Sequence, residues 1–382
     1  MSRRTAIVVT TIFEPAFVGG YLKNLRAAGR DAATTIYIIA DRKTPETVAQ
    51  AAERARREGF DVRCPALDEQ TRFLESIGAP ADFVPWNTDN RRNIGFLMAL
   101  ADGADVLISI DDDNFCRSET DYVGAHQVVG AACSDPVVRS SDGWFNICDQ
   151  LGGWETGQVF ARGFPYFAQR AERETSIVEA DPELPIAINA GLWLDDPDVD
   201  AIYRLCRRPN GKTFRGDSVV LGADVWSPIN TQNTALTREA ALCYYYVRMG
   251  FPLQGLKIDR FGDILSGYLT QKVVKHLGQG VRIGSPVVDH HRTQHNLFKD
   301  LYHELAGIVL IEEFVPWLME ARLEGGTSLE AYASLASQMA DAAEQFRGFI
   351  WDDGGREFLR ETAALMQTWI EIVQRGIEVR AK

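Results

Sequence analysis

The first third of the chain alternates short apolar runs with longer stretches in which apolar residues recur every three or four positions. Continuous aliphatic runs predict buried parallel strands, and the spaced pattern predicts amphipathic helices. The predicted strands are 6–10, 35–40, 61–64 and 106–110, and the predicted helices are 18–28, 44–59 and 91–101. This alternation indicates an α/β fold in which a mainly parallel sheet carries helices on both faces.

The pattern is less regular up to about residue 297 and helical throughout after it. Residues 142–163 are rich in Gly, Trp and Asp and predict a loop. Later elements are predicted strands at 186–194 and 281–288 and predicted helices at 237–249 and 264–276. Near the end, Thr327 and Glu330 have the spacing of a capping box. We therefore expect an α/β domain over residues 1–300 and a C-terminal helical region over residues 301–382.

Composition narrows the class of protein. The 382 residues are 46% hydrophobic and 24% charged, which excludes a disordered chain, a collagen and a small disulfide scaffold. No window approaches the 18 or more apolar residues of a membrane span, and the apolar run at 6–9 is too short for a signal-peptide core. The expected location is therefore cytoplasmic.

The charge and the cysteines exclude further classes. A net charge of −13 argues against a nucleic-acid partner, because such proteins carry a basic footprint. A small phosphate-bearing substrate remains compatible with it, since local charge, a metal or a helix N-terminus can override the global sign. The six cysteines contain no CxxC pair, so we expect reduced structural thiols rather than a zinc site.

The most informative segment is Asp111-Asp112-Asp113, directly after the apolar run 106–110. Open α/β sheets bind ligands at the carboxyl ends of their strands. Three crowded carboxylates repel one another unless a cation neutralises them. A divalent metal completed by a nucleotide diphosphate is the favoured interpretation, and a solvated acidic turn is the alternative.

Two further segments contain groups that suit a metal or a phosphate. His290 and Arg292 follow the predicted strand 281–288, where an imidazole can bind a metal and a guanidinium can bind phosphate, or where both are ordinary polar residues. Arg162 lies among aromatic residues at 160–166, with Arg170 further on; this suits phosphate or sugar contact, but alone it favours a surface loop.

The remaining candidates are weaker when taken singly. Residues 87–93 open a helix with two arginines, which fits an anion site or an ordinary charged helix start. Asp263 can be a simple N-cap, and Trp193 and Trp226 suit core packing better than sugar stacking. Positions after the first two strands make Thr10, Thr11 and Asp41 candidates for contacting a nucleotide base.

Six segments, in order and spacing, resemble the plant reversibly glycosylated polypeptides, which are UDP-arabinopyranose mutases. They are 91–97 (RRNIGFL), 108–114 (ISIDDDN), 160–166 (FARGFPY), 191–201 (GLWLDDPDVDA), 260–267 (RFGDILSG) and 276–286 (HLGQGVRIGSP), followed by His290. Each segment is weak alone, but together they are specific, and the resemblance extends from about residue 5 to about residue 320.

The resemblance implies a GT-A-like, Rossmann-like nucleotide-sugar fold that interconverts pyranose and furanose rings. It implies a divalent metal, Mn²⁺ favoured and Mg²⁺ as the alternative, and no flavin. NAD is not expected, because the chain has no dinucleotide-binding glycine fingerprint. Among bacterial members the chain is similar to GDP-sugar mutases of antibiotic pathways. This similarity favours a GDP-sugar of the GDP-L-galactose or GDP-L-fucose type over a UDP-sugar, in antibiotic or glycan biosynthesis.

The same resemblance assigns residues to roles. Arg162 matches the arginine that becomes reversibly glycosylated, and Arg170 resembles a second functional arginine at a spacing one residue longer. Only Asp263 of the family's paired aspartates carries over, and it or Asp112 would remove a proton. The expected metal ligands are Asp113, Asp111 and His290. The expected substrate-binding residues are Thr10, Asp41, Asn87, Arg91, Asp111, Trp193, Arg260 and Arg292.

Several alternatives stay open at this point. A guanidinium is a poor nucleophile because it is almost always protonated, so Arg162 either acts electrostatically or needs a nearby base. A retaining glycosyltransferase with an external acceptor would use the same nucleotide site. A catalytically silent binding subunit is a third interpretation, against which the intact aspartates weigh. The helices after residue 300 suit intramolecular packing or contacts in a homo-oligomer.

Overall fold

The computed structural model describes residues 3–154, 157–292 and 296–378. Its centre is an eleven-stranded sheet in the order β3-β2-β1-β4-β12-β9-β15-β11-β6-β8, with β5 paired to β15. The strands of this sheet are β1 Thr5–Thr11, β2 Thr34–Ala40, β3 Asp61–Arg63, β4 Val106–Ile110, β5 Asn114–Cys116, β6 Val137–Ser140, β8 Thr175–Val178, β9 Ile186–Asp195, β11 Val219–Leu221, β12 Asn233–Thr237 and β15 Gly280–His290. Two small pairs, β7 Leu151–Gly152 with β10 Thr213–Phe214 and β13 Phe251–Pro252 with β14 Lys257–Ile258, lie outside it.

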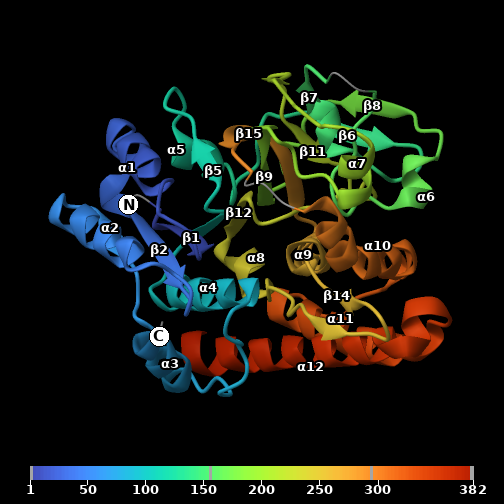
Figure 1. Cartoon of the computed structure of the whole chain (residues 1–382). Coiled ribbons are helices and arrows are strands. Elements are labelled where there is room, and N and C mark those ends of the chain that lie inside the picture. Colours follow the sequence, from blue (N-terminus) through green and yellow to red (C-terminus); the bar gives the residue numbers. More distant parts are fainter. Residues whose placement is uncertain (1–2, 155–156, 293–295, 379–382) are drawn as a thin grey trace.

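Helices pack on both faces of this sheet. They are α1 Val18–Ala27, α2 Glu46–Arg57, α3 Leu67–Ser76, α4 Arg92–Ala101, α5 Tyr122–His126, α6 Tyr166–Gln169, α7 Ala201–Cys206, α8 Arg238–Leu242, α9 Gly262–His276, α10 Leu297–Glu320, α11 Ser328–Ala342 and α12 Arg356–Ile372. Figure 1 shows α1 and α5 on one face and α4, α8 and α9 on the other, with α11 and α12 below them in the view. The predicted α/β fold, with helices on both faces of one sheet, is confirmed.

The direction of the strands explains where a ligand can bind. Strands β3, β2, β1 and β4 are parallel, as their buried aliphatic sequences predict. Strand β12 runs antiparallel to both β4 and β9, and β15 is parallel to β9. The strands β1, β2, β4, β9 and β15 therefore all end at the same edge of a sheet that is mixed beyond β4.

Close packing of α4 on the sheet positions its first residues at this edge. Gly95 lies against β1 and β2, and a Cβ added to it would come 2.4 Å from Val8 and 3.0 Å from Ile39. A larger residue would push α4 away from the sheet. The close approach lets Arg92, the first residue of α4, reach the residues that follow β4.

The C-terminal helices share one hydrophobic core with the sheet. The indole of Trp369 on α12 donates a hydrogen bond of 2.8 Å to the carbonyl of Leu242 at the end of α8. The predicted capping box is present at the start of α11, where Thr327 and Glu330 satisfy each other's backbone N–H groups. The division at residue 300 stays a prediction, and α10 begins three residues before it.

The predicted helix over 237–249 is wrong after its first turn. Helix α8 ends at Leu242, and the following chain is irregular and buried. Side chains replace the helical hydrogen bonds there: Asn93 accepts from the backbone N–H of Tyr246, while Asn90 and Asn93 donate to its carbonyl. These bonds from a distant part of the chain are invisible to sequence periodicity. The predicted loop 142–163 contains β7, and its residues 155–156 lie outside the described residues.

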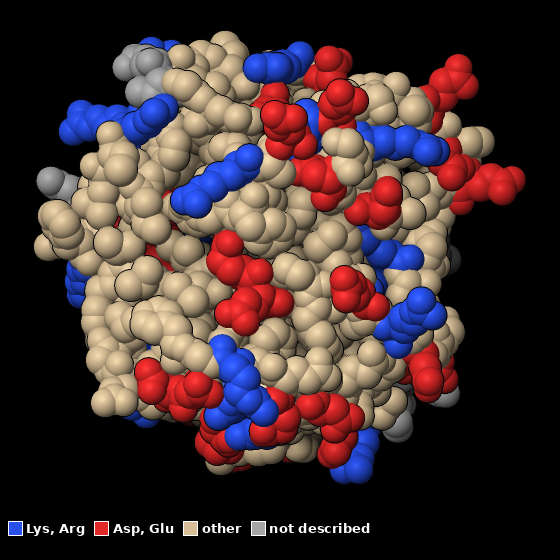
Figure 2. Space-filling model, turned by 90° about the vertical axis from the view of Figure 1, so that its right-hand side faces the viewer, with Lys and Arg blue, Asp and Glu red and all other residues tan. Residues whose placement is uncertain are grey.

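Two surface properties bear on partners. Within the described ranges, no helix is long and apolar enough to cross a membrane. Figure 2 shows one face of the molecule, on which acidic and basic side chains are interspersed rather than gathered by sign.

Candidate functional site

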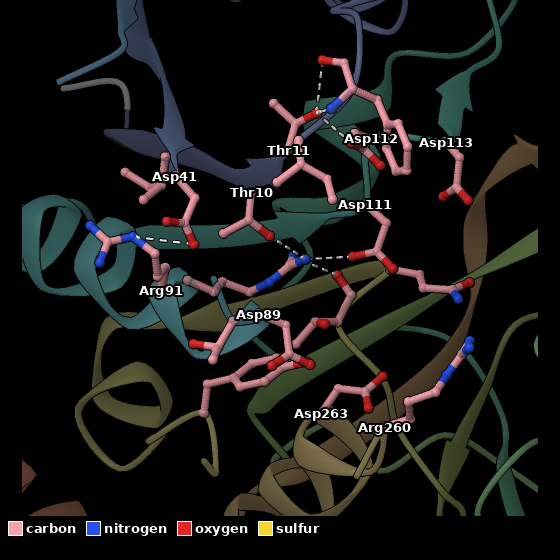
Figure 3. Close-up of a pocket in the computed structure, with 18 of the residues that line it drawn as sticks. Thr10, Thr11, Asp41, Asp89, Arg91, Asp111, Asp112, Asp113, Arg260 and Asp263 are labelled. Carbon is pink, nitrogen blue, oxygen red and sulfur yellow. Dashed lines mark hydrogen bonds and ion pairs between the residues drawn. The ribbon is translucent and has the colours of Figure 1, made fainter. Parts of the chain in front are cut away.

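A cavity of about 510 Å³ opens at the edge where β1, β2, β4 and β15 end. Figure 3 shows charged side chains from all sides of this cavity pointing into it. The predicted site residues that line it are Thr10, Asp41, Asn87, Arg91, Asp111, Asp112, Asp113, Arg162, Arg260, Asp263, His290 and Arg292. Segments from both halves of the α/β fold are thus brought to one place.

Two predicted site residues lie elsewhere. Trp193 lies near the end of β9, its side chain is buried in the core, and it does not line the cavity, so its predicted role in binding substrate has no support in its position. Almost every residue of β9 is buried, because protein covers both faces of this strand. An indole in such a strand packs in the core and cannot reach a ligand. Arg170 follows α6, is exposed and does not line the cavity, so the predicted catalytic role has no support in its position.

The acidic cluster, by which we mean Asp111, Asp112 and Asp113, follows β4 directly. Arg92 donates from Nη2 to Asp111 Oδ1 at 2.5 Å, and its Nη1 is held by the hydroxyl of Ser109 at 2.6 Å. Burial raises the pKa of Asp111 above its ordinary value, an effect that Arg92 opposes. Arg92 was predicted only as one of the two arginines of the possible anion site at 87–93, and its bond to Asp111 was not predicted.

Asp112 and Asp113 have no guanidinium partner within ion-pair distance among the described residues. The hydroxyl of Thr11 donates to Asp112, and burial raises the pKa of Asp112 to about 6. Asp113 Oδ2 lies 3.2 Å from Nε2 of His290. The acidic cluster therefore holds three carboxylates against one fixed guanidinium, which leaves room for an added positive charge.

The donor chemistry of Asp113 and His290 fits a divalent cation. Nδ1 of His290 bonds to the backbone carbonyl of Asp196, so it carries the proton and directs Nε2 toward Asp113. A histidine that ligates a metal commonly has this arrangement, with its other ring nitrogen held by a carbonyl. Asp111 is engaged by Arg92 instead, and the described residues contain no group of three or more His, Cys, Asp or Glu side chains that could hold an ion. Of the three predicted metal ligands, Asp113 and His290 therefore lie together, and Asp111 is bound to Arg92.

The arginine cluster, by which we mean Arg162, Asp198 and Asp263, lines the same cavity. Arg162 donates to Asp198 from Nε at 2.9 Å and from Nη2 at 3.0 Å. It donates to Asp263 from Nη1 at 3.1 Å and from Nη2 at 2.7 Å, and to the carbonyl of Arg260 from Nη1 at 2.5 Å. All five N–H bonds of the guanidinium are therefore used.

This arrangement keeps Arg162 protonated. Burial alone would lower the pKa of Arg162, but the two carboxylates raise it well above its ordinary value. Burial opposes ionisation of Asp198, yet Arg162 and the side chain of Asn230 lower the pKa of Asp198 to about 2. Asp198 was not predicted as a site residue. It lies inside the segment 191–201, whose resemblance to the family was the indication that could have found it.

Helix α10 supplies carboxylates that hold two more arginines. Asp300 accepts from Arg260 and, at 2.9 Å, from Arg292. Glu304 accepts from the backbone N–H of Ala201 at 2.7 Å and lies 3.6 Å from Arg260. Arg260 has a φ of +53°, an uncommon value for a residue other than glycine. The helical region predicted as an appendage thus contributes directly to the wall of the cavity.

The opposite end of the cavity is formed by the residues after β2 and before α4. The guanidinium of Arg91 lies 3.7 Å over the ring of Trp86, and its Nε is 3.9 Å from Asp41. Burial lowers the pKa of Arg91 to about 10. Thr10 contacts Nη2 of Arg92 at 3.3 Å. The carboxylate of Asp41 and the hydroxyl of Thr10 line the cavity here, and such groups can bind a nucleoside.

Comparison with known proteins identifies relatives along most of the chain. A family model described as "Reversibly glycosylated polypeptide" matches residues 7–375. A probable UDP-arabinopyranose mutase 4 of Arabidopsis thaliana is 26% identical over 318 residues, covering 82% of this chain and 78% of the relative. The UDP-arabinopyranose mutase 1 of the same plant is 24% identical, covering 82% and 80%.

Among solved structures, the chain is similar to glucosyl-3-phosphoglycerate synthase from Mycobacterium tuberculosis in complex with Mn²⁺ and UDP-glucose. The TM-score is 0.39 at 11% identity, covering 81% of this chain and 79% of that one.

Proposed function

The chain belongs to the reversibly glycosylated polypeptide family, and from this premise we propose that it is a metal-dependent nucleotide-sugar mutase. As an isomerase, it would interconvert the pyranose and furanose forms of a sugar attached to a nucleoside diphosphate. The observation that carries the proposal is the meeting, in one cavity, of the acidic cluster, His290 and the arginine cluster. The curated relatives are named UDP-arabinopyranose mutases.

The charges that line the cavity support the need for a metal. Eight carboxylates face six lysine and arginine side chains there, and a nucleoside diphosphate adds further negative charge. Asp113 and His290 would hold the cation, Mn²⁺ favoured and Mg²⁺ as the alternative. Such an ion supplies charge neutralisation for the diphosphate as it separates from the anomeric carbon.

Side chains of the protein would bind the sugar and the diphosphate. Arg92 holds Oδ1 of Asp111 in the cavity. The other carboxylate oxygen of Asp111 can accept a hydrogen bond from a sugar hydroxyl. Arg260 and Arg292, held by Asp300, can retain the diphosphate while the sugar ring reopens and closes. Retention matters because the sugar must return to the same nucleotide.

Arg162 is best assigned an electrostatic role in this proposal. As a nucleophile it would have to lose a proton and break bonds to Asp198 or Asp263, both of which raise its pKa. As a fixed cation it can stabilise negative charge on the open-chain intermediate. Intact-mass analysis after incubation with substrate tests this. A glycosyl adduct in the wild-type protein that disappears in Arg162→Lys would instead support the nucleophile.

We further propose a GDP-sugar of the GDP-L-galactose or GDP-L-fucose type as substrate, in antibiotic or glycan biosynthesis in the cytoplasm. The support is the similarity of the sequence to bacterial GDP-sugar mutases, and a UDP-sugar is the alternative that the relatives' names suggest. Residues 1–300 would form the nucleotide-sugar domain, which residues 301–382 complete through Glu304.

One assay tests the activity and the nucleotide together. The protein is incubated with Mn²⁺ and a panel of GDP- and UDP-sugars, without an acceptor, and products are resolved by chromatography and NMR. The proposal expects a new isomer of equal mass that is lost with a chelator. Release of free nucleotide and sugar, or turnover only after an acceptor is added, would instead indicate a retaining glycosyltransferase.

A further inference from the structure

Asp89 and Tyr246 form a pair in the cavity that the functions assigned above do not use. Asp89 begins the short 3₁₀ segment Asp89–Arg91, is exposed, and lines the cavity. The hydroxyl of Tyr246 donates to Asp89 Oδ2 at 3.0 Å. Figure 3 shows Asp89 and Asp263 below Asp111 in the view. The charges of Asp263, in the arginine cluster, and of Arg92, which holds Asp111, both act on Asp89, so the pair lies near both clusters.

Tyr246 is held rigidly. Its side chain is buried, and its ring lies 5.9 Å from the guanidinium of Arg92. Its backbone carbonyl accepts from the amides of Asn90 at 2.6 Å and Asn93 at 3.0 Å, and Asn93 also accepts from its backbone N–H at 2.8 Å. The irregular chain after α8 is thus built to place this hydroxyl beside Asp89.

Asp89 differs from most carboxylates of the cavity in having no basic partner. The cavity-lining carboxylates with a basic group within 4.0 Å are Asp41, Asp111, Asp113, Asp198, Asp263 and Glu304. Among the described residues only Asp89 and Asp112 lack one, and Asp112 belongs to the acidic cluster, next to the expected metal ligand Asp113. Asp89 is therefore the carboxylate best placed to exchange a proton away from the metal.

Ring interconversion requires such an exchange. The lone pair of one sugar hydroxyl, O4, forms a bond to C1 and the hydroxyl loses its proton. The C1–O5 bond breaks, its electron pair stays on O5, and O5 gains a proton. Resting on the proposed function, we infer that Asp89 is a catalytic residue that takes the proton from O4 and returns it to O5, and that Tyr246 positions it. The reverse reaction uses the same residue, and no external acid or base is consumed.

The surroundings of Asp89 suit this task. Although Asp89 is open to the cavity, desolvation by the protein around it raises its pKa to about 6; the hydrogen bond from Tyr246 and the charge of Arg92 lower the pKa, whereas the charges of Asp263 and Asp259 raise it. A carboxylate with a pKa near the working pH both accepts and returns a proton readily. These are the charged groups that act on Asp89 from the surrounding elements.

The test separates ring interconversion from departure of the diphosphate. A nucleotide sugar carrying ¹⁸O in the bridge between C1 and phosphorus reports reversible cleavage of that bond by positional isotope exchange. In Asp89→Asn we expect isomerisation to fall about 100- to 10,000-fold, the range typical of general acid–base catalysis, while isotope exchange stays within about threefold. Asp68→Asn, which removes an exposed carboxylate on α3, is the matched control and should change neither rate.

Other outcomes decide against the inference or against its premise. Near-normal isomerisation by Asp89→Asn, or a parallel fall of isomerisation and isotope exchange, overturns it. If Asp89→Asn does not fold, Tyr246→Phe decides: loss of the hydroxyl should raise the pKa of Asp89 and move the acidic limb of the pH–kcat profile to higher pH, and an unmoved limb overturns the inference. A wild-type protein with neither isomerisation nor isotope exchange on any nucleotide sugar would show that the proposed function itself is wrong.

Discussion

The acidic cluster and the arginine cluster line one cavity, but their charges are balanced in opposite ways. Arg162 uses every N–H bond on Asp198, Asp263 and a backbone carbonyl, so the arginine cluster is complete without a ligand. In the acidic cluster, Asp111 is the one carboxylate with a guanidinium partner among the residues that the structure describes. The difference teaches that one wall is preformed, whereas the other is left to be completed by a cation and a substrate.

The largest effect should come from breaking the preformed wall. Arg162→Ala leaves two buried carboxylates facing each other, and removing one partner of a buried ion pair costs about 3–5 kcal/mol. We expect the free energy of unfolding, measured by urea denaturation, to fall by about that amount, together with loss of activity. Arg282→Ala is the matched control, because Arg282 is a buried partner of Asp135 outside the cavity. It should lose stability but keep the affinity for nucleotide, and an Arg162→Ala protein as stable as wild type would contradict the comparison.

The acidic cluster should lose less stability than the arginine cluster when one charge is removed. Asp113→Ala removes one of several repelling carboxylates, but it also removes the partner of His290, which helps to lower the pKa of Asp113. We therefore expect the free energy of unfolding to fall by less than in Arg162→Ala. Isomerisation should fall about 100- to 1,000-fold, as when one preorganised electrostatic group is lost. Calorimetric titration with Mn²⁺ in the presence of nucleoside diphosphate should show weakened binding. Normal Mn²⁺ affinity in this variant would mean that the cation is held elsewhere.

These two clusters also show what sequence alone could and could not predict. Asp111, Asp112 and Asp113 were found because an aliphatic run followed by acids is a local pattern, and the end of a parallel strand is a known place for ligands. Asp198 was missed because its role depends on Arg162, 36 residues away in the chain.

The same limit applies to the rest of the site and fold. Tyr246 reaches the cavity only because Asn90 and Asn93, more than 150 residues earlier, replace the helical bonds after α8. Periodicity therefore predicted a longer helix there. Trp193 was misplaced because an indole in a buried strand and one in a binding site look alike in sequence. The strands β1, β2 and β4, in contrast, could be predicted from their own residues alone.

Acid should remove more stability from the arginine cluster than from an exposed carboxylate pair, because the pKa of Asp198 is lowered much further on folding. The pKa of Asp198 is lowered from 3.8 to about 2, so its contribution to stability is fully present above pH 4 and is lost as the pH falls toward 2. The loss over that window should be about 2 kcal/mol. Urea denaturation at several pH values would measure it, and in Asp198→Asn the dependence should flatten. An equally steep dependence in that variant would assign the acid sensitivity to other carboxylates.

The smallest expected effect lies outside both clusters, at the end of the cavity where we propose that the nucleotide binds. Trp86 supports Arg91, whose guanidinium lies 3.7 Å over its ring, but Trp86 itself does not line the cavity. Trp86→Ala removes a cation–π contact worth about 1 kcal/mol, so we expect nucleoside diphosphate binding to weaken about fivefold. The kcat should be unchanged, because Arg91 is distant from the bonds that break. Trp86→Phe keeps an aromatic face and should recover most of the affinity. A fall in kcat with unchanged affinity would instead mean that Arg91 acts near the sugar. The acidic cluster and the arginine cluster would then not be sufficient to explain the reaction.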